Sequence, residues 1–317
     1  MANSHSLFQQ FNSNISIGSS KKEKMKNSKD KLRERIRKYF KDNHPEYEPK
    51  FYIQGSYKMK TAIRTKDDIC DLDDGVYFFR KPEVTATTLQ SWVKNAVDGF
   101  TSENPEHRKK CIRNIFKSDY EIDIPVYYKV DNENYKLAVK NEGWEESDPK
   151  EMVDWFNNKK DSEGVLVKIV KYLKAWCDHR RKSMPPGLAM TILASNALQK
   201  IGINNKRDDI TLRDILKEIK KELDLSFKCI VPAIPNDDLF ADYTKEKRDD
   251  FMNALETFIS DADKALDEKN KQKASNYWRK HLGDRFPEGE NVNEEAKSTQ
   301  YASLLGVAAT SKPWGKI

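Results

Sequence analysis

Five aspartates crowd the segment 67–74, and two of them have the spacing of a metal-binding pair. In a β-strand, side chains two residues apart point to the same face. Asp71 and Asp73 would therefore lie side by side, with Leu72 directed into the core. Two neighbouring carboxylates repel each other and lose hydration when they are partly buried. A metal ion, a lysine or bulk water must offset that cost.

A third carboxylate, that of Asp123, follows in the segment 120–130. The sequence around it, "DYEIDIPVYYKV", has apolar residues at every second position, as a strand does. Asp123 then shares a face with Glu121 and Tyr127. If the two strands are neighbours, three carboxylates converge at one place and form a site for hard divalent cations. Two Mg²⁺ ions held there can activate an attacking hydroxyl and stabilise a leaving pyrophosphate. The opposite face carries Ile122, Ile124, Val126 and Tyr128.

Two other interpretations of the aspartates stay open at this point. Aspartate density alone favours an acidic surface turn as strongly as a metal site. An EF-hand loop is disfavoured, because "DDICDLDD" has no glycine at the sixth loop position and no glutamate at the twelfth. The strand context and Asp123 favour the metal site.

Gly55-Ser56 precedes the aspartates and supports the same interpretation. Glycine lets the backbone approach a ligand closely, and a serine hydroxyl with neighbouring N–H groups can bind phosphate oxygens. An isolated Gly-Ser pair is usually a turn. Here it follows an apolar strand, and a hairpin would bring it next to Asp71.

Composition excludes several classes of protein. The net charge of +6 permits a polyanionic ligand without requiring one, and no apolar run is long enough to span a membrane. The N-terminal segment makes a poor signal peptide, so we expect a cytoplasmic protein. The chain contains no Walker A, G-x-G-x-x-G or G-x-S-x-G motif. Its four cysteines form no C-x-x-C pair, which argues against a disulfide framework and a structural zinc site: Cys70, Cys111, Cys177 and Cys229.

The elements that must position these residues divide the chain into four parts. We predict a flexible N-terminus over 1–20, a mixed α/β core with an N-terminal helix over 21–160, a helical lobe over 161–290 and a tail over 291–317. The core would contain helices at 21–43 and 86–98 and strands at 51–54, 69–79 and 120–130. The second lobe would contain helices at 163–182, 188–201, 211–224, 244–267 and 270–282.

Together these motifs resemble the polymerase-β-like nucleotidyltransferases. "QGSYKMKTAI", then D-x-D-D-G-V-Y-F, then "EIDIPVYY" look most like the bacterial CD-NTases of anti-phage CBASS systems, relatives of cyclic GMP-AMP synthase and oligoadenylate synthase. "IVKYLKAW" followed by "MPPGLAMTILASNAL" extends the resemblance into the helical half. It implies an α+β fold class: a bilobal nucleotidyltransferase core, with a mixed sheet and flanking helices, plus a helical C-terminal lobe.

The resemblance also implies roles for single residues. Asp71, Asp73 and Asp123 would be the catalytic metal ligands for two Mg²⁺ or Mn²⁺ ions. The nucleotide-binding residues would be Gln54, Gly55, Ser56, Arg113, Lys171 and Lys174. Of these, Lys174 would contact the donor triphosphate with help from Lys171, and Arg113 would contact donor phosphate. A solvated helix face is the plainer interpretation of Lys171.

The function implied is synthesis of a cyclic di- or trinucleotide second messenger from nucleoside triphosphates, with ATP, GTP or both as substrates. The expected partners are these nucleotides and a cyclic-nucleotide-responsive effector, with no membrane and no obligatory nucleic acid, and the protein would act as a monomer. A non-cyclising nucleotidyltransferase acting on RNA or a small molecule is the nearest alternative. A silent nucleic-acid-binding module, using the basic runs of 21–38 and 168–182, is a third, although it needs no converging aspartates.

Overall fold

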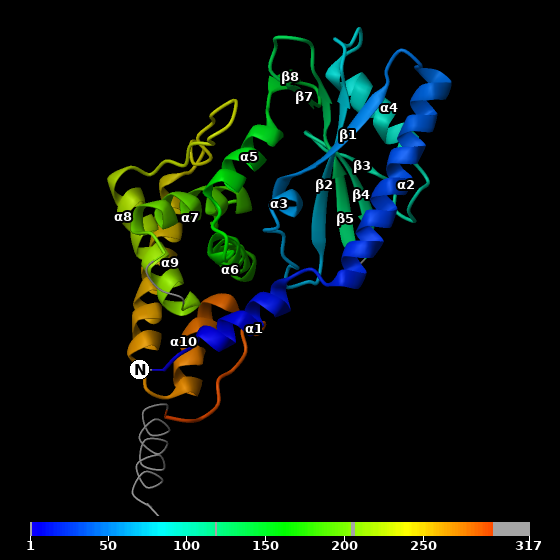
Figure 1. Cartoon of the computed structure of the whole chain (residues 1–317). Coiled ribbons are helices and arrows are strands. Elements are labelled where there is room, and N and C mark those ends of the chain that lie inside the picture. Colours follow the sequence, from blue (N-terminus) through cyan, green and yellow to red (C-terminus); the bar gives the residue numbers. More distant parts are fainter. Residues whose placement is uncertain (1, 118, 204–206, 294–317) are drawn as a thin grey trace, which may run out of the picture.

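The computed structural model describes residues 2–117, 119–203 and 207–293, which form a sheet lobe and a helical lobe (Figure 1). The helices are α1 (His5–Ile15), α2 (Ser19–Asn43), α3 (Gly55–Lys58), α4 (Ala86–Val97), α5 (Pro149–Lys159), α6 (Val165–Arg180), α7 (Gly187–Ile201), α8 (Asp208–Leu225), α9 (Lys245–Asp267) and α10 (Lys271–Leu282). The strands are β1 (Pro49–Gln54), β2 (Cys70–Phe78), β3 (Glu106–His107), β4 (Ile112–Phe116), β5 (Tyr120–Ile124), β6 (Val126–Tyr128), β7 (Lys136–Val139) and β8 (Gly143–Glu146).

The strand β2 is the centre of the sheet. It pairs with β1 in an antiparallel hairpin and with β5 and β6 in parallel. The single strand predicted over 120–130 is interrupted at Pro125, which has no N–H to donate but whose carbonyl accepts from the N–H of Val76 at 2.9 Å. β4 continues the sheet beside β5, and β7 continues it beside β6. The predicted mixed sheet is confirmed.

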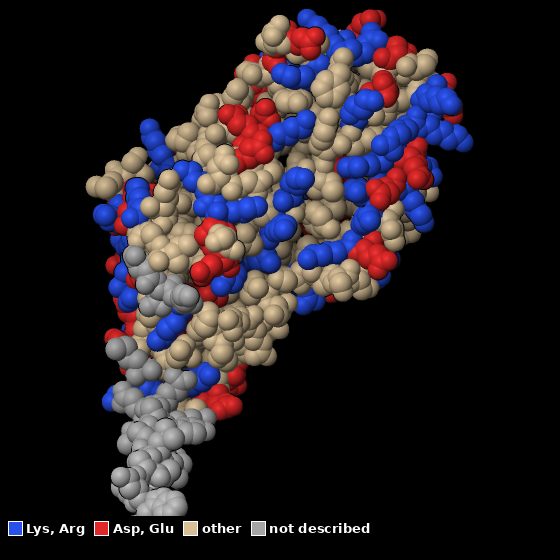
Figure 2. Space-filling view, in the orientation of Figure 1, with Lys and Arg blue, Asp and Glu red and all other residues tan. Residues whose placement is uncertain are grey.

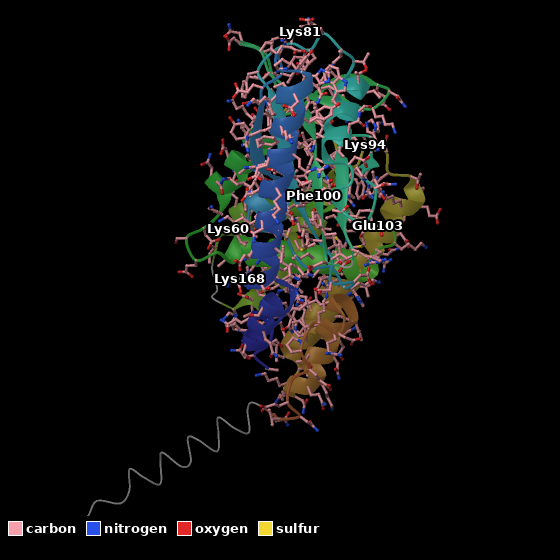
Figure 3. The ribbon with its side chains drawn as sticks, turned by 90° about the vertical axis from the view of Figure 1, so that its right-hand side faces the viewer. Lys60, Lys81, Lys94, Phe100, Glu103 and Lys168 are labelled. Carbon is pink, nitrogen blue, oxygen red and sulfur yellow. The ribbon has the colours of Figure 1, made fainter. Side chains whose placement is uncertain are left out.

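One face of the sheet is covered by α2 and α4, which lie side by side in Figure 3. The buried stripe of α2 follows helical spacing through Met25, Leu32, Ile36 and Phe40, and packs on the sheet. Its other face is basic and exposed, and basic side chains gather along this edge of the molecule in Figure 2. This is the solvated face that helical charge runs usually form.

The helical lobe is built around α6 and α7, whose buried residues share one apolar cluster with α8, α9 and α10. The predicted helices of this half are confirmed to within a few residues of each end. α5 also packs into this cluster through Met152, Val153 and Phe156, although it precedes residue 160. α5 therefore contributes to the core of the helical lobe.

The prediction that residues 1–20 are flexible is wrong for α1. Leu7, Phe8, Phe11 and Ile15 recur at helical spacing and are all buried. Phe8 packs against Trp278 and Phe286 with ring centroids 5.0 and 4.8 Å apart. Burial of these rings fastens the N-terminal helix to the helical lobe.

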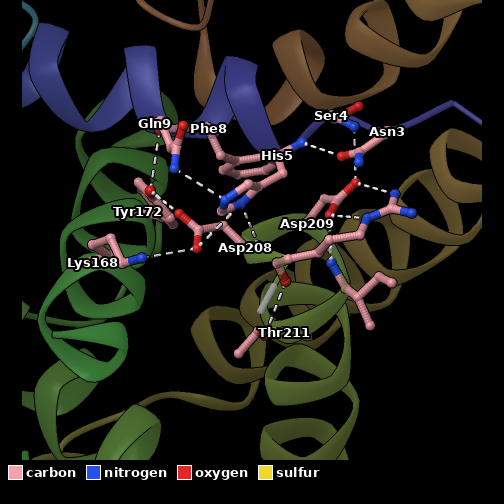
Figure 4. A network of polar contacts seen from close by, with 12 residues as sticks. Asn3, Ser4, His5, Phe8, Gln9, Lys168, Tyr172, Asp208, Asp209 and Thr211 are labelled. Atoms are coloured by element: carbon pink, nitrogen blue, oxygen red, sulfur yellow. Dashed lines mark hydrogen bonds and ion pairs between the residues drawn. The ribbon is translucent and has the colours of Figure 1, made fainter. Parts of the chain in front are cut away.

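Buried polar contacts fix the same helix to α6 and α8 (Figure 4). The carboxylate of Asp208 accepts from the Tyr172 hydroxyl at 2.7 Å and pairs with Lys168 at 3.1 Å. The N–H of Asp208 donates to Nδ1 of His5 at 3.0 Å. Asp209 accepts from the N–H of Ser4 at 3.0 Å. Each buried carboxylate in this network has a partner within the fold.

The predicted tail over 291–317 lies almost wholly outside the described residues, which end at 293. None of the helices in the described part of the chain combines the length and apolar character that crossing a membrane requires.

Candidate active site

A cavity of about 650 Å³ lies where the hairpin β1–β2 faces the helical lobe, which is the size range of small-molecule sites. The first wall comes from the turn after β1 and from β2, which contribute Gln54, Gly55, Ser56, Asp71 and Asp73. The second wall comes from α6 and α7, and the segment from β8 into α5 closes one end. The described core thus brings most of the predicted site residues to one place.

The register of the parallel pair β2–β5 places the carboxylates as the sequence predicts. Asp71 lies opposite Glu121, and Asp73 lies opposite Asp123. Asp71 is exposed and Asp73 is half-buried, and both line the cavity. The prediction that the two strands are neighbours is confirmed.

The hairpin also brings Gly55 against Asp73. Gln54 pairs with Asp73 across β1 and β2. Gly55 has a positive φ of 61°, and a Cβ at this position would lie 2.1 Å from Oδ2 of Asp73. Only glycine permits both the left-handed backbone and this close approach. The turn is closed by the Ser56 carbonyl, which accepts from the N–H groups of Thr61 and Ala62 at 2.9 and 3.1 Å.

Lys174 on α6 reaches the cavity from the opposite wall. Its Nζ donates to Oγ1 of Thr61 at 3.1 Å and to the Thr61 carbonyl at 3.3 Å, so the ammonium lies beside the Gly55-Ser56 turn. Burial lowers the pKa of Lys174 to about 8, against the opposing effect of Asp71 and Asp73. Gly187 at the start of α7 leaves room for the lysine stem, because a Cβ there would be 3.2 Å from its Cε.

Asp73 is the carboxylate whose charged form is disfavoured by its surroundings. Burial raises its pKa to about 7, and the charges of Asp71 and Asp123 act in the same direction, against Lys174 and Arg113. Within the described ranges no hydrogen bond or ion pair reaches the Asp73 carboxylate. A cation brought in from solution would relieve this repulsion.

Asp123 differs, because Arg113 holds both of its oxygens. Arg113 faces Asp123 across β4 and β5, and its Nε and Nη2 donate to the two carboxylate oxygens at 2.8 and 2.7 Å. The guanidinium also pairs with Glu121. Arg113 was predicted to contact donor phosphate, but here it neutralises the third carboxylate.

These contacts decide how far the site fits a metal. Among the described residues, no three His, Cys, Asp or Glu side chains come together as a metal-binding group. The three carboxylates do lie near one another, since Asp71 and Asp123 both act electrostatically on Asp73, but Arg113 occupies Asp123. Asp71 and Asp73 do fit a divalent cation, since both line the cavity and no basic side chain of the described residues forms an ion pair with either. Asp123 fits as a further ligand only after Arg113 releases it.

The structure does not bring Lys171 to the cavity. Its Nζ donates to Oγ of Ser16 at 3.1 Å, where α1 passes into α2. Lys171 lies three residues before Lys174, slightly less than one full turn of the helix. The two side chains therefore leave α6 in somewhat different directions and meet different groups. Lys171 thus contacts the N-terminal segment.

Sequence reasoning missed several residues that line the cavity. Thr61 carries the lysine contact but lies in an unpatterned loop. Strand alternation places Tyr127 on the face of Asp123 but indicates no role for it. One end of the cavity is closed by the end of β8 and the residues that follow it: Glu145, Glu146, Ser147 and Asp148. The strands β7 and β8 are too short to give a periodic signal in the sequence.

Comparisons with known proteins match the segment that carries the aspartates and the Gly55-Ser56 turn. Residues 49–127 match the family model described as "Cyclic GMP-AMP synthase DncV-like, nucleotidyltransferase domain". The chain is 30% identical over 168 residues to a cyclic GMP-AMP synthase of Escherichia albertii, an alignment that covers 48% of this chain and 38% of the relative. It is 22% identical to a cyclic AMP-AMP-AMP synthase of Acinetobacter sp., covering 80% of this chain and 77% of the relative. The alignments with cyclic GMP-AMP synthases span about half of those proteins or less, 38% of one and 54% of another.

Solved structures share the fold. The crystal structure of Vibrio cholerae DncV cyclic AMP-GMP synthase superposes with a TM-score of 0.78 at 20% identity, covering 90% of this chain and 97% of that chain. The same enzyme in complex with the linear intermediate 5′ pppA(3′,5′)pG gives a TM-score of 0.77 at 20% identity, with the same coverage of both chains. At this level of identity the likeness establishes the fold alone.

Proposed function

We propose that this chain, whose residues 49–127 match the DncV-like nucleotidyltransferase domain, joins nucleoside triphosphates into a cyclic di- or trinucleotide. The observation that carries the proposal is the placement of Asp71 and Asp73 beside the Gly55-Ser56 turn, with Lys174 on the facing wall. ATP and GTP are the proposed substrates, because the relatives are named as cyclic GMP-AMP and cyclic AMP-AMP-AMP synthases.

The residues on the two walls divide the work of binding the donor nucleotide. The Ser56 hydroxyl and the backbone of the turn would hold phosphate oxygens, and the Lys174 ammonium would neutralise the terminal phosphates. Asp71 and Asp73 would hold two Mg²⁺ or Mn²⁺ ions. Such ions supply charge neutralisation of the phosphates and make a hydroxyl a better nucleophile.

Asp123 would complete the place where the acceptor hydroxyl lies. Its position opposite Asp73 supports this role, for which Arg113 must leave it. Attack of the hydroxyl on the α-phosphate forms a phosphodiester bond and releases pyrophosphate. A linear intermediate, such as the one that the Vibrio cholerae enzyme binds, would then reorient in the cavity. Attack of its free hydroxyl on the α-phosphate of its own triphosphate would close the ring and release a second pyrophosphate.

The biological setting proposed is the one that the resemblance implies. The product would act as a second messenger on a cyclic-nucleotide-responsive effector in anti-phage defence. The enzyme would work in the cytoplasm as a monomer, without a membrane or an obligatory nucleic acid.

The test is to incubate the protein with labelled ATP, GTP, CTP and UTP and with Mg²⁺ or Mn²⁺, and to identify the products by mass spectrometry. We expect products that resist phosphatase, because a ring has no terminal phosphate. Linear chains or a nucleotidylated acceptor would instead support the non-cyclising alternative, which uses the same site. Equal activity of the Asp73→Asn variant would overturn both.

A further inference from the structure

Gln54 precedes the Gly55-Ser56 turn directly, and its side chain is held at both ends. It is 8% exposed. The Tyr77 hydroxyl donates to its Oε1 at 2.8 Å, and its Nε2 donates to the Tyr127 hydroxyl at 3.1 Å. The resemblance places Gln54 among the nucleotide-binding residues, yet its amide is bonded within the protein. Its orientation is therefore fixed before any ligand enters.

The sheet topology brings the two tyrosines together. Tyr77 on β2 and Tyr127 on β6 are partners across a parallel pair, and their rings stack with centroids 4.6 Å apart and planes 8° apart. Both are buried, at 0% and 2% exposure. Burial raises the pKa of each hydroxyl above its usual value, so both phenols keep their protons for hydrogen bonding.

Gly75 makes room for the bonded amide. A Cβ at this position would lie 2.6 Å from Oε1 of Gln54 and 2.7 Å from the ring of Tyr77. Gly75 has no positive φ, so the backbone conformation does not require glycine here. Glycine is required because the Gln54 side chain occupies the space that a Cβ would fill.

The position of Gln54 couples the two halves of the site. It is the strand partner of Asp73, and the next residue, Gly55, contacts the Asp73 carboxylate. A shift of Gln54 would move the phosphate-binding turn relative to the metal-binding aspartate. We propose that Tyr77, Gln54 and Tyr127 form a positioning set that holds the Gly55-Ser56 turn in register with Asp73. This inference rests on the function proposed above and assigns a positioning role to two tyrosines that the proposed reaction does not use as metal ligands or phosphate contacts.

Tyr77→Phe is the cleanest test, because it removes one hydroxyl behind the cavity wall and no substrate contact. We expect kcat for nucleotide joining to fall by about 10-fold, as loss of a residue that orients a metal ligand typically causes. The KM for the donor nucleotide should stay within about twofold, since the phosphate contacts remain. Tyr120→Phe is the matched control: this buried tyrosine lies in the same sheet, and its hydroxyl bonds Ser28 at 2.9 Å, away from the cavity.

A double mutant separates positioning from general loss of structure. If Tyr77 acts through Gln54, adding Tyr77→Phe to a Gln54→Met variant should lower kcat no further. Melting temperatures of Tyr77→Phe and Tyr120→Phe should fall by similar amounts. Additive losses, or a Tyr77→Phe enzyme with the kcat of the Tyr120→Phe control, would overturn the inference.

If Tyr77→Phe does not fold, Gln54→Met alone must show the loss of kcat with an unchanged KM. A normal kcat for Gln54→Met would then overturn the inference. A wild-type protein that joins no nucleotides would count against the proposed function instead.

Discussion

Asp73 and Asp74 are consecutive residues of β2, but their carboxylates face opposite sides of the sheet and have opposite surroundings. Asp74 is 3% exposed, and Arg33 of α2 donates to it through two nitrogens, Nε at 2.7 Å. Asp73 faces the cavity, where no hydrogen bond or ion pair from the described residues reaches it. One strand therefore carries a satisfied charge and an unsatisfied one, a single residue apart.

The difference shows which charges the fold keeps for a ligand. The buried carboxylates elsewhere have basic partners: Asp208 pairs with Lys168, Asp209 with Arg207, and Asp261 with His281. An isolated buried charge is too costly to retain without a reason. Asp73 is half-buried without such a partner among the described residues, at the place where a metal-bound nucleotide would supply the missing positive charge.

The largest expected effect separates these two neighbours. Asp73→Asn should lower nucleotide joining by on the order of 10³-fold or more, because it removes a metal ligand, while the protein remains folded. Asp74→Asn should instead destabilise the fold by about 3 kcal/mol, since it leaves Arg33 without its carboxylate. Activity per folded molecule and denaturant titration measure the two. An Asp74→Asn enzyme that is fully stable but inactive would contradict the comparison.

The second prediction compares Lys174 with Lys171 on α6. Lys174→Met should raise the donor KM by about 10-fold or more, because a charge-assisted contact to phosphate is lost. Lys171→Met should leave the KM close to wild type, since its ammonium bonds Ser16. Steady-state kinetics with varied nucleotide check both variants. Equal KM increases would show that Lys171 also reaches the donor.

The third prediction concerns Asp123, whose carboxylate is held by Arg113. Arg113→Met should lower the melting temperature of the metal-free protein, because Asp123 and Glu121 lose their shared cation. It should also increase the rise in melting temperature on adding Mg²⁺, since Asp123 becomes free to bind. Thermal melts with and without Mg²⁺ measure this, and an unchanged Mg²⁺ response would contradict it.

The smallest expected effect is on stability as a function of pH. Asp73 has a pKa of about 7 in the fold, above its ordinary value of 3.8. Its contribution to stability is therefore fully present below the ordinary value and is lost as pH rises to about 7. Asparagine cannot ionise, so metal-free Asp73→Asn should melt above wild type at about pH 8 and show a smaller difference at about pH 5. A difference independent of pH would contradict the assignment.

Much of this site could be predicted because it depends on short-range rules. Strand alternation put Asp71 and Asp73 on one face, and the glycine-serine pair marked a close approach. Helical spacing found the core helices for the same reason, since burial of one face repeats every turn. The stripe of α1 was equally visible in Leu7, Phe8, Phe11 and Ile15, but its polar surroundings at the chain terminus suggested a flexible segment.

What could not be predicted depends on long-range packing. Arg113 reaches Asp123 only because β4 and β5 pair in one particular register, which their sequences do not fix. Lys171 meets Ser16 because α1 folds back over α6, 155 residues away along the chain. The bonding of Gln54 by Tyr77 and Tyr127 likewise requires three strands in register.

The most direct test of the account is whether metal-bound nucleotide supplies the charge that Asp73 lacks. Thermal melts of wild type and Asp73→Asn would be measured with Mg²⁺ alone, with each nucleoside triphosphate alone, and with both together. We expect Mg²⁺ with ATP or GTP to raise the melting temperature of wild type by several degrees and that of Asp73→Asn much less. A wild-type melting temperature indifferent to Mg²⁺ and every nucleotide, or an equal rise in Asp73→Asn, would contradict the account.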